Sequence, residues 1–279
     1  IDELAQEIRE FIHRYFECDE EFESVLVAYV LLTWVYQRFQ AIPYLRFLGL
    51  SGTGKTRASE TIGAVCYRTI TLGGSLTSAA LFRVPDVIGG TMFIDEADFD
   101  KSGIGSDIAK ILNDGYRRGL PVTRMHQGAD NSFVPKLYDV FCPKLLNGRS
   151  EYRDDATESR CLVHTPRPLT RSEIPLQLSD DFEEEALTLQ NKLLQWRFDV
   201  FDQIQPAEIK IGSLRPRTNE ILMPLLCVAN QLTDARYRQH IVRYGHALED
   251  QALEERKMSV EGMLLKAYSK FNAMNLPTC

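Results

Sequence analysis

Residues 49–56 read GLSGTGKT, a Walker A pattern able to hold a polyphosphate. The three glycines let the backbone curl so that its N–H groups face phosphate oxygens. Lys55 can bring a mobile positive charge to the β- and γ-phosphates, and Thr56 can offer a hydroxyl to Mg²⁺. We therefore predict a nucleotide-binding loop made of Gly49, Ser51, Gly52, Thr53, Gly54, Lys55 and Thr56.

The segments on either side of this loop support the interpretation. The mostly apolar run at 44–48 predicts a short buried strand, and residues 57–67 predict a helix. A helix that begins directly after the loop directs its positive N-terminal end at the same anion. The alternative is a glycine-rich turn with an unrelated lysine, which leaves the strand and the helix unexplained.

A second pattern, TMFIDE at residues 91–96, ends an apolar strand in two carboxylates. Asp95 lies 40 residues after Lys55, with a predicted strand and helix between them. We expect Asp95 to hold Mg²⁺ through its water shell and Glu96 to polarise an attacking water. The alternative is an ordinary strand end, because acidic residues often follow buried strands.

Asn147 follows the next predicted core strand, residues 141–146. Its neutral amide can orient the attacking water or contact the γ-phosphate without competing for Mg²⁺. An Asn147-Gly148 turn is the alternative. We favour function, because the strand order brings this strand end close to the usual nucleotide crevice.

Arg160 lies directly before the last predicted strand of the sheet. An arginine that enters a neighbouring subunit's site can stabilise charge on a transferred phosphoryl group. Arg149 and Arg153, in the same loop, are competing candidates. The alternative is a surface arginine paired with Glu158 or Asp155.

Arg217 and Glu220 begin a helix in the second half of the chain. We expect Arg217 to reach back to the γ-phosphate and couple the helical section to the nucleotide, with Arg215 as an alternative. A solvated helix N-terminus is the other possibility. An arginine opposes the helix dipole at that end unless an anion is near.

A hairpin is predicted over residues 121–140, with its turn at 128–131. Its strands carry Arg124, His126 and Lys136, which we predict to grip a nucleic-acid backbone. A solvated surface hairpin without a ligand is the alternative.

The pattern of elements predicts an α/β protein with a parallel sheet covered by helices, followed by an all-helical lid. We divide the chain into a helical segment at 1–42, a nucleotide-binding core at 43–178, and a lid with a linker at 179–279. Further helices are predicted at 2–17, 21–40, 77–82, 104–118, 179–201, 217–232, 234–249 and 259–273, and further strands at 68–72, 88–94 and 161–164.

Composition narrows the class of protein. The net charge of −7 gives no overall basic field for nucleic acid, although a local groove can still be basic. Six cysteines without a C-x-x-C pair predict reduced thiols of a cytoplasmic protein. The longest charge-free apolar stretch, residues 24–37, is too short for a membrane span. Because the chain starts at Ile1, we expect it to be part of a longer protein.

Together these motifs resemble the AAA+ ATPase family over residues 40–250. Within that family, a β-hairpin directly before the strand that ends in Asn147 resembles the clade of the minichromosome maintenance and viral superfamily-three helicases. Ser159-Arg160-Cys161 resembles the Ser-Arg-Phe finger motif of the former. Residues 217–230 (RTNEILMPLLCVAN) and 43–56 resemble ATPase domains carried by phages, plasmids and mobile elements.

The resemblance implies an Mg²⁺-dependent ATPase that works as a ring, most often a hexamer, with Arg160 of one subunit completing the site of the next. It also implies a DNA helicase or translocase of a mobile-element or phage replication protein. One alternative is a AAA+ remodeller or signalling ATPase that acts on protein without nucleic acid. Another is a monomeric small-molecule kinase.

Overall fold

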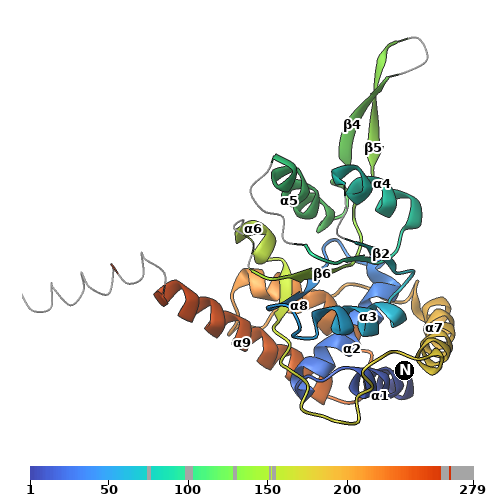
Figure 1. Ribbon diagram of the computed structural model, residues 1–279, viewed down its shortest axis with the longest axis vertical. Coiled ribbons are helices and arrows are strands. Elements are labelled where there is room, and N and C mark those ends of the chain that lie inside the picture. The colour runs from blue at the N-terminus through green and yellow to red at the C-terminus, as the bar shows by residue number, and fades with distance from the viewer. Residues whose placement is uncertain are drawn as a thin grey trace, which may run out of the picture.

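Short apolar strands pair side by side in the parallel sheet that positions the rest of the molecule (Figure 1). The computed structural model describes residues 1–73, 77–97, 103–127, 131–150, 152, 155–258 and 264. Across these residues the sheet has five strands in the order β2-β3-β6-β1-β7. They are β1 (Tyr44–Leu48), β2 (Ile70–Leu72), β3 (Met92–Ile94), β6 (Lys144–Gly148) and β7 (Cys161–His164). The predicted α/β class with a mainly parallel sheet is confirmed.

Helices cover both faces of this sheet, with α4 and α5 on one side and α2 and α3 on the other (Figure 1). A separate antiparallel ribbon of β4 (Val122–Gln127) and β5 (Phe133–Tyr138) projects from the body. The helices are α1 (Asp2–Tyr15), α2 (Glu20–Val35), the 3-10 segment η1 (Tyr36–Arg38), α3 (Lys55–Val65), α4 (Ser78–Ile88), α5 (Gly103–Gly115), α6 (Asp155–Glu158), α7 (Asp180–Val200), α8 (Pro216–Ala229) and α9 (Arg236–Met258).

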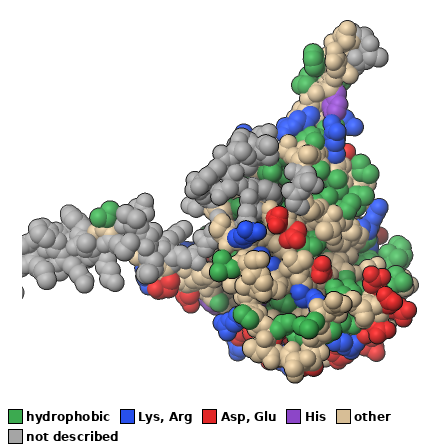
Figure 2. All heavy atoms as spheres, in the orientation of Figure 1, with side chains coloured by type: hydrophobic (Ala, Val, Ile, Leu, Met, Phe, Trp, Pro, Cys, Tyr) green, Lys and Arg blue, Asp and Glu red, His purple; other side chains and the backbone are tan. Residues whose placement is uncertain are grey.

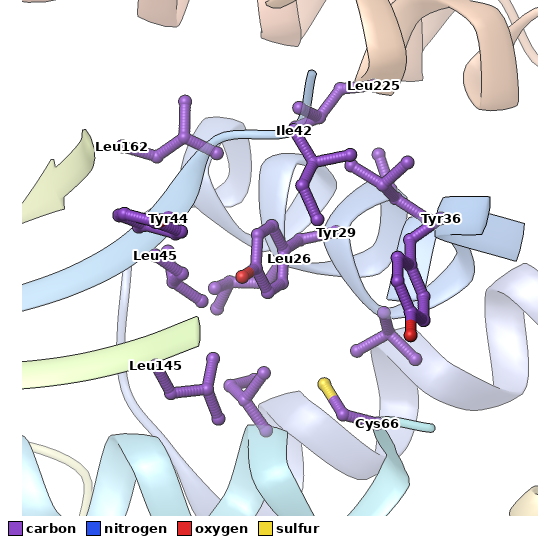
Figure 3. Close-up of a cluster of buried hydrophobic side chains, with 14 of the residues drawn as sticks. Leu26, Tyr29, Tyr36, Ile42, Tyr44, Leu45, Cys66, Leu145, Leu162 and Leu225 are labelled. Atoms are coloured by element: carbon purple, nitrogen blue, oxygen red, sulfur yellow. The ribbon is translucent and has the colours of Figure 1, made fainter. Parts of the chain in front are cut away.

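Helix α2 forms the centre of the core, and every residue from Phe22 to Val35 is buried. The Tyr29 hydroxyl donates to the Lys144 carbonyl of β6 at 2.9 Å, and Trp34 Nε1 donates to the Val65 carbonyl of α3 at 2.9 Å. Side chains from α2, β1, β6 and α8 gather around Tyr29 (Figure 3). Residues of all three predicted segments therefore contribute to one hydrophobic cluster.

Parallel pairing gives the sheet two chemically different ends. The loop at residues 49–54 follows the carboxyl end of β1, where the Gly49 N–H donates to the Gly148 carbonyl at 3.2 Å. At the amino end of β1, the Tyr44 N–H donates to the Arg160 carbonyl at 3.0 Å. The five residues of β1 span about 16 Å, so these two ends are well separated.

Some predicted boundaries differ from the structure for local reasons. Helix α4 continues past Pro85 to Ile88, because Gly89 adopts a left-handed conformation (φ 57°) and its N–H donates to the Pro85 carbonyl. The strand predicted at 141–146 instead covers Lys144–Gly148. The Val140 and Cys142 carbonyls accept from the Lys144 ammonium at 3.0 and 3.2 Å.

Two predictions fall wholly or partly outside the described residues. The helix predicted at 259–273 lies there except for Leu264, and so does most of the hairpin turn predicted at 128–131. Within the part of the chain that the structure describes, no helix combines the length and the apolar character needed to cross a bilayer.

Gly115 ends α5 at a point with no room for a side chain. A Cβ there would lie 2.6 Å from the Val140 carbonyl oxygen and 2.8 Å from Lys144 Nζ. We expect Gly115→Ala to lower the free energy of unfolding by about 1–3 kcal/mol, although alanine is the better helix former. Urea unfolding measures the change. A Cβ at Gly212 would have no atom within 4 Å, so Gly212→Ala should change the free energy of unfolding by no more than about 0.5 kcal/mol. Equal changes in the two variants would contradict the packing argument.

His164 gives the fold an acid sensitivity. Its ring stacks on Phe22 at 4.0 Å between centroids, and burial lowers the pKa of His164 from 6.5 to about 4. The unfolded chain therefore binds more protons between these pH values, and stability falls as the pH drops from about 6.5 towards 4. We expect about 2 kcal/mol of this loss between pH 7 and 4.5 to disappear in His164→Phe. Urea unfolding of both chains at the two pH values measures this loss. An equal loss of unfolding free energy in the wild type and in His164→Phe would contradict the prediction.

Candidate nucleotide-binding site

The loop between β1 and α3 has the backbone of an anion cradle. Gly49, Gly52 and Gly54 have φ angles of 150°, 84° and 92°, in the region that favours glycine. Gly54 is the N-cap of α3, so the first N–H groups of that helix open towards the loop. At Gly49 a Cβ would lie 2.8 Å from Thr53 Oγ1, which makes the position intolerant of a side chain.

Lys55 folds over this loop. Its ammonium donates to the carbonyl oxygens of Gly49 at 2.5 Å and Leu50 at 2.7 Å. These carbonyls are weak partners for an ammonium compared with a phosphate, to which a charge-assisted bond forms. The lysine is therefore held at the loop and available to an anion.

A cavity of about 370 Å³ lies over the loop at the carboxyl end of the sheet. The predicted residues Ser51, Gly52, Gly54, Lys55, Thr56, Asp95, Glu96 and Asn147 line it together with Arg57, Gly148 and Arg149. The fold thus brings the glycine loop, both carboxylates and the asparagine to one place, as the sequence predicted. Gly49 and Thr53 belong to the same loop without lining the cavity, and Thr53 Oγ1 donates to the Leu50 carbonyl at 3.0 Å.

Asn147 is held in a buried hydrogen-bond chain. Its side chain is 1% exposed, and its Oδ1 accepts from Ser59 Oγ at 2.6 Å. Its Nδ2 donates to Asp95 Oδ1 at 3.1 Å, an orientation fixed by the carboxylate, which can only accept. Asn147 lies inside β6 and not in an Asn-Gly turn, so its first effect is to position Asp95.

Ser59 is the member of this chain that sequence patterns missed. It lies four residues after Lys55 on α3 and is fully buried. The i, i+4 spacing places it on the same side of the helix as Lys55, which was the available signal.

Glu96 has a strained backbone at the mouth of the cavity. Its φ of 56° lies in the left-handed region, which is uncommon for a residue with a side chain. Its carboxylate is 64% exposed and lies 3.7 Å from Arg149 Nη2. Strain of this kind costs about 1–3 kcal/mol and persists where surrounding contacts enforce it, which happens often at functional sites.

The donor set near the loop fits a magnesium ion held with a nucleotide. Thr56 is exposed on the first turn of α3, and Asp95 directly follows β3 and lines the same cavity. One carboxylate, one hydroxyl and phosphate oxygens are the usual ligands of nucleotide-bound Mg²⁺. Among the described residues there is no group of three or more His, Cys, Asp or Glu side chains that could hold a metal without such a ligand.

Arg160 lies at the opposite end of the sheet from the cavity of its own chain. Its backbone carbonyl pairs with Tyr44 at the start of β1, and its guanidinium lies 5.3 Å from the Tyr116 ring centroid. The side chain also donates to the Ala156 carbonyl of α6. Of the two alternative partners, Glu158 accepts from Arg46, and the side chain of Asp155 lies outside the described residues.

Arg217, which we expected to reach the γ-phosphate, is not among the residues that line the cavity of its own chain. Its guanidinium lies 5.7 Å from the same Tyr116 ring and pairs with Glu220 at 2.6 Å. Because Tyr116 lies beside the amino end of β1, Arg217 shares the far end of the sheet with Arg160. Arg215 pairs with Glu249 of α9 at 3.8 Å.

Arg149 and Arg153 were the competing candidates for the arginine that enters a neighbouring subunit's site. Arg149 lines the cavity of its own chain. Arg153 lies outside the described residues.

The hairpin gathers its predicted cations on one face. Arg124 and Lys136 are directly paired across the two strands, and His126 lies two residues further along the same face. Like charges placed opposite each other destabilise a ribbon unless an anion is near. Arg124 also lies over the Phe82 ring at 5.1 Å, and His126 Nε2 lies 2.6 Å from the Tyr138 hydroxyl. Figure 2 shows basic and histidine side chains gathered on the ribbon.

The opposite face of the ribbon is apolar, which the sequence analysis did not recognise. Met125, Phe133 and Leu137 are 57%, 66% and 62% exposed and alternate with the cations. The period of two in these strands was the available signal.

Comparisons with known proteins give little beyond this geometry. No protein-family model matches the chain. No curated protein matches it. Among solved structures, the chain is similar to the apo structure of the NrS-1 C-terminal region (305–718), with 12% identity and a TM-score of 0.44. The likeness covers 82% of this chain and 52% of that one, so the chain spans about half the length of that structure.

Proposed function

We propose that this chain is an ATPase of the AAA+ type that hydrolyses ATP with Mg²⁺ and works as a ring-shaped oligomer, such as a hexamer, on DNA. The observation that carries the proposal is the cavity in which Lys55, Asp95 and Asn147 meet above a glycine cradle. A DNA helicase or translocase module of a mobile-element or phage replication protein is the form of this activity that the hairpin and the motif order favour.

The proposed chemistry uses the residues of the cavity in distinct roles. The loop N–H groups and Lys55 bind and orient the phosphates. Thr56 and Asp95 would hold Mg²⁺, which would supply positive charge to the phosphate oxygens. Glu96 orients and polarises the attacking water, and Asn147 keeps Asp95 in place through the 3.1 Å hydrogen bond.

The proposed ring follows from the position of the arginines. Arg160 and Arg217 lie at the amino end of the sheet, about 16 Å from the loop of their own chain by the length of β1. In a head-to-tail assembly, that end of one copy meets the cavity of the next. Both arginines then serve the γ-phosphate of a neighbour. A monomeric small-molecule kinase offers no partner for them.

The proposed DNA contact rests on the cationic face of the hairpin. Arg124 and Lys136 have the spacing to grip a phosphate backbone, and a ribbon that projects from the body can enter a central channel. One observation favours a second candidate, a remodeller that acts on protein. The exposed apolar face of the same ribbon, with Met125 and Leu137, suits an unfolded polypeptide.

Glu96→Gln should separate nucleotide binding from hydrolysis. The amide keeps the shape of the side chain but cannot act as a general base, so we expect kcat to fall by about 10²–10⁴-fold with little change in ATP affinity. Steady-state phosphate release and titration with a fluorescent ATP analogue measure the two quantities. Lys55→Ala, the matched control, should lose affinity as well. Hydrolysis by Glu96→Gln at the wild-type rate would contradict the assignment.

The two faces of the hairpin distinguish the two candidate substrates. We expect Arg124→Ala/Lys136→Ala to abolish DNA stimulation of hydrolysis and to spare basal hydrolysis. Each lost phosphate contact should also lower the slope of log affinity against log salt by about one. Met125→Ser/Leu137→Ser, on the other face of the same strands, is the matched control and should keep DNA stimulation.

The opposite pattern would favour the protein remodeller. In that case DNA would not stimulate hydrolysis in any variant, while an unfolded polypeptide would stimulate the wild type and not the Met125→Ser/Leu137→Ser chain.

A further inference from the structure

A fully buried arginine lies in the strand that leads to the nucleotide loop. Arg46 is 0% exposed and sits three residues before Gly49, in a strand whose other residues are apolar or aromatic. A buried guanidinium is costly unless it is paired and hydrogen-bonded. The proposed hydrolysis gives Arg46 no role, so its partners must explain it.

Those partners all lie between Asn147 and Arg160. One guanidinium nitrogen of Arg46 donates to the Glu158 carboxylate, and Nη2 donates to the Ser150 carbonyl at 2.6 Å. The guanidinium Cζ of Arg46 lies over the Tyr152 ring, 3.6 Å from its centroid. Glu158 also accepts from the Tyr152 N–H at 2.8 Å, so Arg46 and Tyr152 donate to the same carboxylate.

Glu158 is part of the short segment that holds Arg160. It ends α6, two residues before Arg160. The Arg160 N–H donates to the Thr157 carbonyl at 3.1 Å, and Thr157 Oγ1 donates to Asn113 Oδ1 of α5 at 3.2 Å. Arg160 is therefore bonded to the short segment that Arg46 holds through Glu158, as well as to Tyr44 of β1.

Stability alone is a poor explanation for this pair. Replacing a buried ion pair by apolar residues of similar volume is often neutral or stabilising, whereas breaking it by removing one partner is strongly destabilising. Such pairs select one arrangement among several. Here the arrangement selected joins the loop strand to the segment that offers an arginine to the neighbour.

We infer that Arg46 and Glu158 are positioning residues that hold Arg160 ready for the nucleotide of the adjoining subunit. The inference rests on the proposed ATPase.

The test mixes two inactive chains so that each interface position can be changed separately. Lys55→Ala leaves a chain that donates Arg160 but has a dead site, and Arg160→Ala leaves a chain that accepts an arginine but donates none. Equal mixing should restore ATP hydrolysis at the interface between them. Glu158→Gln is then added to one chain at a time, with Mg²⁺-ATP as substrate and phosphate release as readout.

We expect Glu158→Gln in the Lys55→Ala donor to lower the restored rate by at least about tenfold, because it misplaces Arg160. The same change in the Arg160→Ala acceptor should leave the restored rate within about twofold. A general loss of folding would lower both mixtures alike, so this asymmetry is a signature that a purely structural role does not give.

A second variant covers the case in which Glu158→Gln alone does not fold. Arg46→Gln/Glu158→Gln removes both charges and leaves no unpaired buried ion, and we expect it to show the same asymmetry. Equal rates with the change in donor or acceptor would overturn the inference. No rescue between Lys55→Ala and Arg160→Ala chains without further change would instead overturn completion of the site in trans, and the inference with it.

Discussion

Parallel strand pairing is the constraint on which the rest of the structure depends. All five strands of the described sheet run parallel. The loops that follow the strands therefore lie at one end of the sheet, and the segments that precede them lie at the other. The glycine loop, Asp95 and Asn147 fall at the carboxyl end, and Arg160 and Arg217 fall at the other. No side chain bridges a strand length of about 16 Å, so one copy of the chain cannot supply both halves of the proposed site.

Two hydrogen-bonded arrangements connect these ends to the sheet between them. On the α3 face, Ser59, Asn147 and Asp95 link the helix that begins at the loop to the carboxylate across the cavity. On the other face, Arg46 links β1 to α6. Arg46 and Asn147 are buried, and both arrangements connect neighbouring elements by directional hydrogen bonds, which restrict geometry more strictly than apolar packing does.

Local sequence patterns predicted the elements whose conformation depends on residues close together in the chain. The loop and α3 follow from glycine spacing and a helix start, and the ribbon from alternation around a turn. Patterns could not place Arg217, because its helix packs beside Tyr116 only in the folded chain. They also predicted β6 too early in the chain. In the structure, the carbonyls of residues 140 and 142 accept hydrogen bonds from the buried Lys144 ammonium. The Arg46–Glu158 pair joins residues 112 positions apart, beyond any periodicity.

The most direct measurement is a structure of the assembled chain with Mg²⁺ and a non-hydrolysable ATP analogue. Our account predicts the γ-phosphate within about 3 Å of Lys55 and of the Arg160 guanidinium from an adjoining copy, with the ion between Thr56 and Asp95. A γ-phosphate contacted only by its own chain, or a cavity closed off from every other copy, would contradict it.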